Sequence, residues 1–448
     1  MPRRGSENQA NKRPATTAGG DDDEDRLSAL PDPLLQHVLS FLPSRLAVRT
    51  CALARRWRHQ WKSVPAVRVK CSDFANNNLL RCFVNHFLPL RDRAPLRECD
   101  IGAYNGRDIP PLILYALLFR VQVLRVDLTI AGNYAQLRNG NLVSEQLVRL
   151  ELKCVQLEES HFLDFSSCPK LEVVKMDCCA YDSDILSQSL RHLSITGCTL
   201  IPDNTCARIF TPRLISLELA DNYGLTPVLE CMPPLATAFV RLGNGCSEYC
   251  LNSYYGDCGS DDCNEAMVHS DGSVLLDGLS NATNLELIAD PIVCLHRWFK
   301  GMPLLYIVHF PKDLKKSPSF GKLKTLLLSE WCFADKFGAL MYFLQHSPVL
   351  EKLSLELTTS ESLFETHGSC YQREPFLASK HLKVVEVKYH EDEVFALAEV
   401  LKILITCGVP SKKIIIESMT SRISHSKLSV DILLWFVLTL NVFCFSKI

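Results

Sequence analysis

Four cysteines lie close together in this 448-residue chain: Cys246, Cys250, Cys258 and Cys263 fall in a stretch rich in Asp, Gly, Ser and Tyr. Four thiolates of one compact loop can bind zinc tetrahedrally. Three residues separate the first two cysteines and four separate the last two, whereas paired zinc knuckles space theirs by two. We therefore favour an acidic inserted loop, residues 244–272, with free thiols. Zinc binding by these four cysteines is the alternative.

No other residue pattern predicts catalysis. The sequence contains no phosphate-binding GxxxxGK[ST], no GxGxxG, no HExxH and no GxSxG, and its 13 histidines are dispersed. We expect no catalytic residue and no cofactor. With 48 basic and 50 acidic residues the net charge is −2, which offers no general attraction for nucleic acid. The expected function is therefore binding of another protein.

The cysteines and the N-terminus indicate where the chain works. Twenty cysteines are scattered through apolar segments, and the N-terminus lacks the apolar core of a signal peptide. We interpret the thiols as reduced. Residues 1–26 are polar and charged, which predicts a disordered tail, and Arg3-Arg4 with Lys12-Arg13 resemble a two-part nuclear import signal. We expect a protein of the nucleus, the cytoplasm or both.

The residues that follow this tail are predicted to form a short helical unit. Asp32 and Pro33 suit the N-cap and first position of a helix, Pro43 ends that helix, and Ser44 can cap the next one. Apolar residues continue at helical spacing up to Trp61. A unit of about 35 residues buries little of its own apolar surface, so its remaining stripe needs a partner.

These residues closely resemble the F-box motif of substrate-receptor subunits in SCF-type ubiquitin ligases. The resemblance covers residues 27–63 and implies docking on a Skp-type adaptor and, through it, on a cullin. An ordinary helical hairpin packed on the following domain is the alternative. The residues expected to contact the adaptor are Leu30, Pro31, Leu34, Leu35, Val38, Leu39, Leu42, Pro43, Val48, Leu53, Trp57 and Trp61.

Leucine-spaced segments occupy most of the remaining chain. Four of them begin at Leu147, Leu171, Leu190 and Leu214, which are 24, 19 and 24 residues apart. Such spacing is typical of leucine-rich repeats, whose strands stack into a curved solenoid. We predict an α/β fold with a short N-terminal helical F-box, a linker with the first solenoid elements at 64–120, and an irregular solenoid with a parallel sheet at 121–390. Repeat endings of the form Pro-x-Leu-Glu resemble the plant F-box/leucine-rich-repeat family.

The C-terminal residues resemble that family only in part. Residues 391–418 resemble the start of the FBD-type module of many members, with an amphipathic helix that ends at Gly408 and a strand at Ile414–Ile416. The tail, residues 419–448, departs from the family and contains an apolar run over 432–445. Fourteen residues are fewer than the roughly 20 that span a bilayer, so we do not expect a membrane protein. A short tail anchor, a packed helix and a splicing error are the alternatives for this run.

The resemblance implies a non-catalytic receptor that binds a protein target on the solenoid for ubiquitination. A non-degradative interaction scaffold, associated with membranes through the C-terminal tail, is the alternative. The sequence does not identify the target, and it shows no basic pocket for a small-molecule co-receptor.

Overall fold

The protein is described by a computed structural model over residues 29–103, 110–129, 135–136, 142–157, 161–200, 207–230, 232–243, 246–247, 275–289, 319–329, 334–357, 378–390 and 394–419. The predicted N-terminal tail, most of the cysteine-rich loop and residues 420–448 of the C-terminal tail lie outside these ranges. The predictions for a disordered N-terminus and for the apolar run therefore concern residues that the structure does not describe.

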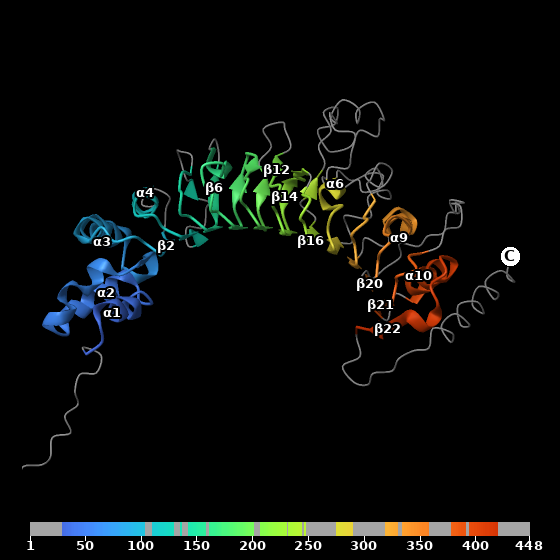
Figure 1. Cartoon of the computed structure of the whole chain (residues 1–448), viewed down its shortest axis with the longest axis horizontal. Helices are drawn as coiled ribbons and strands as arrows, with labels where there is room; N and C mark the ends of the chain where they lie inside the picture. Colours follow the sequence, from blue (N-terminus) through green and yellow to red (C-terminus); the bar gives the residue numbers. More distant parts are fainter. Residues whose placement is uncertain are drawn as a thin grey trace, which may run out of the picture.

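The chain forms an arch in which short helices are followed by a long row of parallel strands (Figure 1). The N-terminal helices are α1 (Asp32–Leu39) and α2 (Ser44–Arg49), followed by the 3-10 helices η1 (Thr50–Ala52) and η2 (Arg55–Ser63). Further along the chain lie η3 (Cys71–Asp73), α3 (Asn77–Leu90), α4 (Pro110–Leu118), η6 (His161–Leu163), α6 (Leu276–Leu279), α9 (Ala334–His346), α10 (Val394–Thr406) and η9 (Ser411–Lys413).

A 13-stranded sheet lines the concave side of the arch, and α4, α6, α9 and α10 lie on the other side (Figure 1). Its strands, in spatial order, are β1 (Ala66–Lys70), β2 (Glu98–Gly102), β3 (Val123–Asp127), β5 (Arg149–Lys153), β7 (Val173–Asp177), β10 (His192–Thr196), β13 (Ser216–Ala220), β16 (Thr237–Leu242), β18 (Asn284–Ala289), β19 (Thr325–Ser329), β20 (Lys352–Leu357), β21 (Val384–Tyr389) and β22 (Ile414–Ser418). Each strand pairs in parallel with the next.

Two narrower parallel sheets complete the turns of the solenoid. The first contains β4 (Ala135–Gln136), β6 (Val155–Leu157), β8 (Ala180–Tyr181), β11 (Thr199–Leu200), β14 (Tyr223–Leu225) and β17 (Cys246–Ser247). The second contains β9 (Ile185–Leu186), β12 (Arg208–Phe210) and β15 (Val228–Leu229). The predicted fold class, a helical F-box region followed by a parallel-sheet solenoid, is confirmed.

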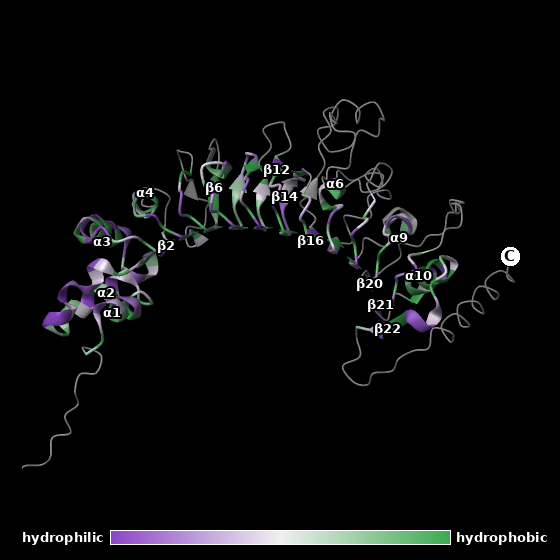
Figure 2. Ribbon diagram, viewed as in Figure 1, coloured by the Kyte–Doolittle hydropathy of each residue, from purple (hydrophilic) through white to green (hydrophobic). Residues whose placement is uncertain are grey.

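Alternation along each strand explains why the strands stack. In β5, Leu150 and Leu152 are buried while their neighbours are half-buried. In β13, Leu217 and Leu219 are buried and Glu218 between them is exposed. Because side chains of a strand point alternately to its two faces, one face fills the interior of the arch and the other faces its concave side. The colours of Figure 2 alternate accordingly along the central strands.

The residue after several strands adopts a left-handed backbone conformation and turns the chain out of the sheet. Cys178 (φ 51°) does so after β7, Gly197 (φ 60°) after β10 and Asp221 (φ 52°) after β13. The next residue is then directed inwards: Cys179 and Cys198 are fully buried. These cysteines therefore fill a structural position of the repeat.

The sheet extends beyond residues 121–390 at both ends. β1 and β2 lie in the segment 64–120, where the first solenoid elements are expected, and β22, at the expected C-terminal strand, pairs with β21. The predicted C-terminal helix is α10, which is mostly hydrophobic (Figure 2) and buries Leu397, Val400, Leu401 and Leu404. Residues 391–418 thus continue the solenoid.

Candidate functional site

The first helix begins one residue earlier than predicted. Pro31 occupies the N-cap position without a side-chain cap, and Asp32 is the first helical residue. The Asp32 carboxylate instead accepts a hydrogen bond from Arg56 at 3.1 Å, which ties α1 to η2. Ser44 is likewise the first residue of α2, not its cap, and its hydroxyl accepts a hydrogen bond from the Arg68 backbone N–H at 2.9 Å. Both side chains connect elements rather than cap helices.

The twelve residues predicted to contact an adaptor divide into two groups. Four of them are buried, with at most 8% of each residue exposed: Leu35, Leu39, Trp57 and Trp61. Four of the twelve are exposed: Pro31, Leu34, Val38 and Leu53. Leu30, Leu42, Pro43 and Val48 are half-buried. The four buried side chains hold the helices together in this conformation, and contact of the twelve residues with an adaptor stays a prediction.

The exposed apolar surface includes two residues that the sequence-based prediction missed. Phe41 is 67% exposed and Leu46 is 43% exposed, beside Leu34, Val38 and Leu53, which are 50%, 43% and 72% exposed. We call these five residues the apolar face. Phe41 follows α1, where the chain leaves the helix, and its ring packs edge-on against His37 with 5.0 Å between centroids. The Phe-Leu-Pro sequence was the signal that could have singled out Phe41.

The same stretch of the chain as the apolar face is rich in positive charge. Residues 30–63 contain six basic residues, Arg45, Arg49, Arg55, Arg56, Arg58 and Lys62, against the single acidic residue Asp32, although the whole chain is weakly acidic. The five arginines are exposed. Exposed leucines amid arginines favour a partner surface that is apolar in the middle and acidic around it.

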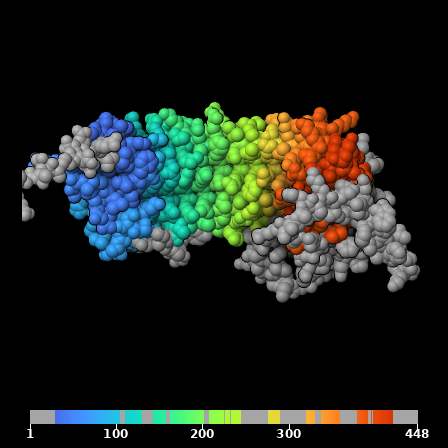
Figure 3. All heavy atoms as spheres, turned by 90° about the horizontal axis from the view of Figure 1, so that it is seen from below, coloured from blue at the N-terminus to red at the C-terminus, as the bar shows by residue number. Residues whose placement is uncertain are grey.

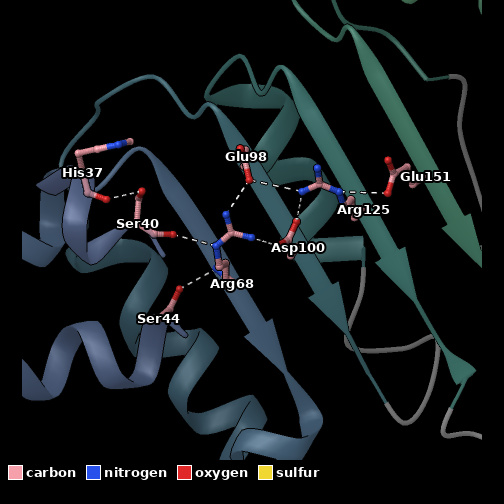
Figure 4. A network of polar contacts seen from close by, with 8 residues as sticks. All are labelled: His37, Ser40, Ser44, Arg68, Glu98, Asp100, Arg125 and Glu151. Atoms are coloured by element: carbon pink, nitrogen blue, oxygen red, sulfur yellow. Dashed lines mark hydrogen bonds and ion pairs between the residues drawn. The ribbon is translucent and has the colours of Figure 1, made fainter. Parts of the chain in front are cut away.

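Arg68 of β1 fixes this unit to the strands (Figure 4). Its guanidinium donates to the Ser40 carbonyl at 2.8 Å, to Glu98 at 2.6 Å and to Asp100. Arg125 extends the network by contacting Asp100 at 2.9 Å and Glu151 at 3.1 Å. Burial by itself raises the pKa of Glu98, but the hydrogen bond and charge of Arg68, aided by Arg125, hold that pKa below its ordinary value.

Figure 3 shows the molecule from below, towards the concave side of the sheet. The parallel register places one side chain from the middle of each strand in a row on this side. In spatial order the row is Arg68, Asp100, Arg125, Glu151, Lys175, Ser194, Glu218, Phe239, Glu286, Leu327, Ser354, Glu386 and Ile415. It is the largest surface on which the strands offer side chains to a partner.

The two ends of this row are already paired by charge. Towards the N-terminus Arg125 contacts Asp100 and Glu151, and towards the C-terminus Glu386 contacts Lys352 at 2.7 Å. In the middle, Lys175 and Glu286 make no ion pair with any residue that the structure describes, and Phe239 lies between Glu218 and Glu286 in the register. Lys175 of β7 and Glu286 of β18 therefore carry charges on the concave side that are not used in ion pairs with described residues.

The cysteine cluster is mostly outside the described ranges. Only Cys246 is described, in β17, so the structure does not test zinc binding by Cys246, Cys250, Cys258 and Cys263. Among the described residues, no group of histidine, cysteine and acidic side chains is arranged to hold a metal ion. The helices in the same ranges are all too short or too polar to cross a membrane.

Comparison with known proteins identifies the N-terminal unit. Residues 27–67 match the family model of the F-box domain. An F-box/FBD/LRR-repeat protein of Arabidopsis thaliana is 25% identical over 75% of this chain and 77% of its own length. A second such Arabidopsis protein is 31% identical over 46% of this chain and 47% of its own. An Arabidopsis FBD-associated F-box protein is 47% identical over 74 residues, 16% of this chain and 17% of its own.

Proposed function

Because residues 27–67 match the F-box domain and the chain is similar to plant F-box/LRR-repeat proteins, we propose that it is the substrate receptor of an SCF-type ubiquitin ligase. The apolar face docks on a Skp-type adaptor, which joins the chain to a cullin. The observation that carries this proposal is the exposure of Leu34, Val38, Phe41, Leu46 and Leu53 in a unit that already has its own buried core. Exposed leucine and phenylalanine side chains of this density favour a protein partner.

The target binds on the concave side, over strands β7–β18. There Lys175, Glu218 and Glu286 carry charges that are not used in ion pairs within the described chain, and Phe239 supplies apolar contact. A target bound there is held near the ubiquitin-conjugating enzyme, and proximity accelerates transfer. The chain itself supplies no catalytic residue and works in the nucleus, the cytoplasm or both.

A non-degradative scaffold is the second candidate. It shares the adaptor-binding unit, so only the fate of a bound protein separates the two functions. Full-length chain is expressed in plant cells with and without proteasome inhibitor, and captured proteins are quantified. A receptor enriches proteins that carry ubiquitin and accumulate when the proteasome is blocked, together with adaptor and cullin. Capture of adaptor and cullin with partners of unchanged abundance supports the scaffold instead.

The same capture tests the adaptor step. Leu34→Asp combined with Val38→Asp places two carboxylates on the apolar face and should remove adaptor and cullin together. Leu118→Asp is the matched control, because Leu118 on α4 is also highly exposed, at 76%, but lies outside the F-box. Docking through this face would be contradicted if Leu118→Asp also lost the adaptor. It would be contradicted as well if the double variant still captured the adaptor.

A further inference from the structure

The F-box is joined to the solenoid with almost no linker. Only Val64 and Pro65 separate the end of η2 from the start of β1, and Val64 is 2% exposed. The Pro65 carbonyl accepts a hydrogen bond from the Arg97 N–H at 2.7 Å, and the Lys62 carbonyl accepts one from the Asp92 N–H at 3.1 Å. The residues that connect η2 to β1 are therefore hydrogen-bonded to the segment that leads into β2.

One side of this joint is closed by Arg68, on the concave side of the sheet. Its backbone and side chain bind the Ser44 hydroxyl and the Ser40 carbonyl of the F-box, while its guanidinium binds Glu98 and Asp100 of β2 (Figure 4). Ser40 and Ser44 are themselves buried, at 8% and 3% exposure. Any rotation of the F-box about residues 64–65 would separate these partners.

A second arginine, Arg91, closes the joint where α3 ends. Arg91 is 7% exposed and donates to the Trp61 carbonyl at 3.4 Å and to the Val64 carbonyl. The same guanidinium donates to the Tyr115 hydroxyl of α4 at 3.2 Å and lies over the Phe87 ring of α3, 5.5 Å from its centroid. Trp61 also stacks on Phe87, with 5.7 Å between centroids. Arg91 thus binds F-box, α3 and α4 at once.

We propose that Arg68 and Arg91 clamp the joint between F-box and solenoid, and that Arg68 is a positioning residue for ubiquitin transfer. The inference rests on the proposed receptor function. With the F-box fixed to β1 and β2, the concave side keeps one distance and orientation from the bound adaptor, so the assembled ligase reaches a restricted set of lysines. Arg68 touches neither adaptor nor target in this role; it acts through the placement of both.

The test compares three substitutions in the full chain. Arg68→Gln removes the charge and most of the network, Arg68→Lys keeps the charge but cannot reach both carboxylates and the Ser40 carbonyl together, and Arg149→Gln is the matched control. Arg149 contacts Glu151 at 3.3 Å within the same strand, so it belongs to the same type of ion pair without touching the F-box. Hydrogen exchange and adaptor capture are measured for each variant.

Arg68→Gln is expected to speed exchange of the residue 68 amide and of residues 40–47 at least tenfold, while residues 149–157 change less than twofold and adaptor capture is kept. Arg68→Lys should give a smaller acceleration, and Arg149→Gln should leave residues 40–47 as in the wild type. Uniform acceleration throughout the solenoid would mean a merely structural role and would overturn the proposal, as would unchanged exchange at residues 40–47.

Transfer is measured in the ligase assembled with adaptor, cullin and conjugating enzyme, with the lysines of the chain itself as acceptors and mass spectrometry to map them. The wild type should concentrate ubiquitin on few lysines, and Arg68→Gln should spread it to others and slow the preferred sites at least threefold. An unchanged lysine map despite faster exchange refutes positioning. If the wild type captures no adaptor, the proposed function itself fails, and exchange alone still decides whether Arg68 holds the joint.

Discussion

Leu34 and Leu35 are neighbours in the sequence, yet one is exposed and the other belongs to the core. Leu35 is fully buried beneath α1, whereas Leu34 is 50% exposed on the apolar face. The helical stripe read from the sequence is wide enough to include both, and spacing alone does not tell which edge faces the core and which faces a partner. Tertiary packing of α1 against η2 decides which edge faces the core.

This difference predicts opposite effects of one substitution at the two positions. Leu35→Ala should reduce the free energy of unfolding by about 2–5 kcal/mol, because it removes buried apolar contacts and leaves a cavity. Leu34→Ala should change it by no more than about 0.5 kcal/mol. Urea denaturation of both variants measures the two values. Equal destabilisation would show that Leu34 belongs to the core and not to the apolar face.

At the residue scale we also expect a dependence on pH. The pKa of Glu98 is lowered in the fold, so its contribution to stability is present above the ordinary pKa of 4.5 and is lost as the pH falls through the lower folded value. Because the Glu98 side chain is 24% exposed, the contribution should be about 0.5–1 kcal/mol. Denaturation between pH 6 and pH 3 should weaken the wild type more than Glu98→Gln. Parallel curves would contradict this.

At the scale of elements, the turn after each strand depends on one inward side chain. Asn222 accepts a hydrogen bond from the Cys198 N–H at 2.9 Å and donates to the Ile195 carbonyl at 3.1 Å. One repeat earlier, the Cys198 thiol accepts a hydrogen bond from the Cys179 N–H at 3.3 Å. Asn and Cys thus satisfy the same buried backbone group in successive repeats.

Substitution of Asn222 should therefore depend on what replaces it. Asn222→Ala leaves the Cys198 N–H without its acceptor and removes one donor to the Ile195 carbonyl, which should cost about 2 kcal/mol. Asn222→Cys restores an acceptor for the Cys198 N–H and should cost roughly half as much. Thermal melting of the two variants compares them. A cysteine variant as unstable as the alanine variant would show that the thiol does not replace the amide.

The same scale shows which elements were predictable. Strands such as β7 and β10 follow from leucine spacing and alternation, because each repeat contributes its own buried face. The bounds of β1 and β2 within 64–120 were less predictable, because α3 separates the two strands and β1 has no leucine two residues before it. The Arg68 network joins residues about 30 positions apart, and only the parallel register brings them together. Sequence spacing contains no signal for it.

At the scale of the whole molecule, the two ends of the sheet are formed in different ways. At the N-terminal end β1 contacts α2 through Arg68 and Ser44, and at the C-terminal end β22 follows β21, with α10 between them in sequence. An unprotected strand edge can pair with another chain. The described residues 394–419 therefore protect the last repeats as well as extend the solenoid.

Two truncations test this protection. A chain that ends after residue 390 should expose the edge of β21 and the apolar surface beneath α10, and it should aggregate. A chain that ends after residue 419 keeps α10 and β22 and should remain monomeric with its adaptor binding intact. Size-exclusion chromatography at several concentrations distinguishes the two. A monomeric shorter chain would show that α10 and β22 are not required for protection.

The proposed receptor function depends most on adaptor binding by the apolar face of the F-box. Its direct test is the dissociation constant between full-length chain and a purified Skp-type adaptor, measured by biolayer interferometry for the wild type, for Leu34→Asp with Val38→Asp, and for Leu118→Asp. We predict at least about 100-fold weaker binding for the double variant, roughly 2.7 kcal/mol, and an unchanged value for the control. If the double variant keeps its fold by circular dichroism and binds the adaptor as tightly as the wild type, the central claim is wrong.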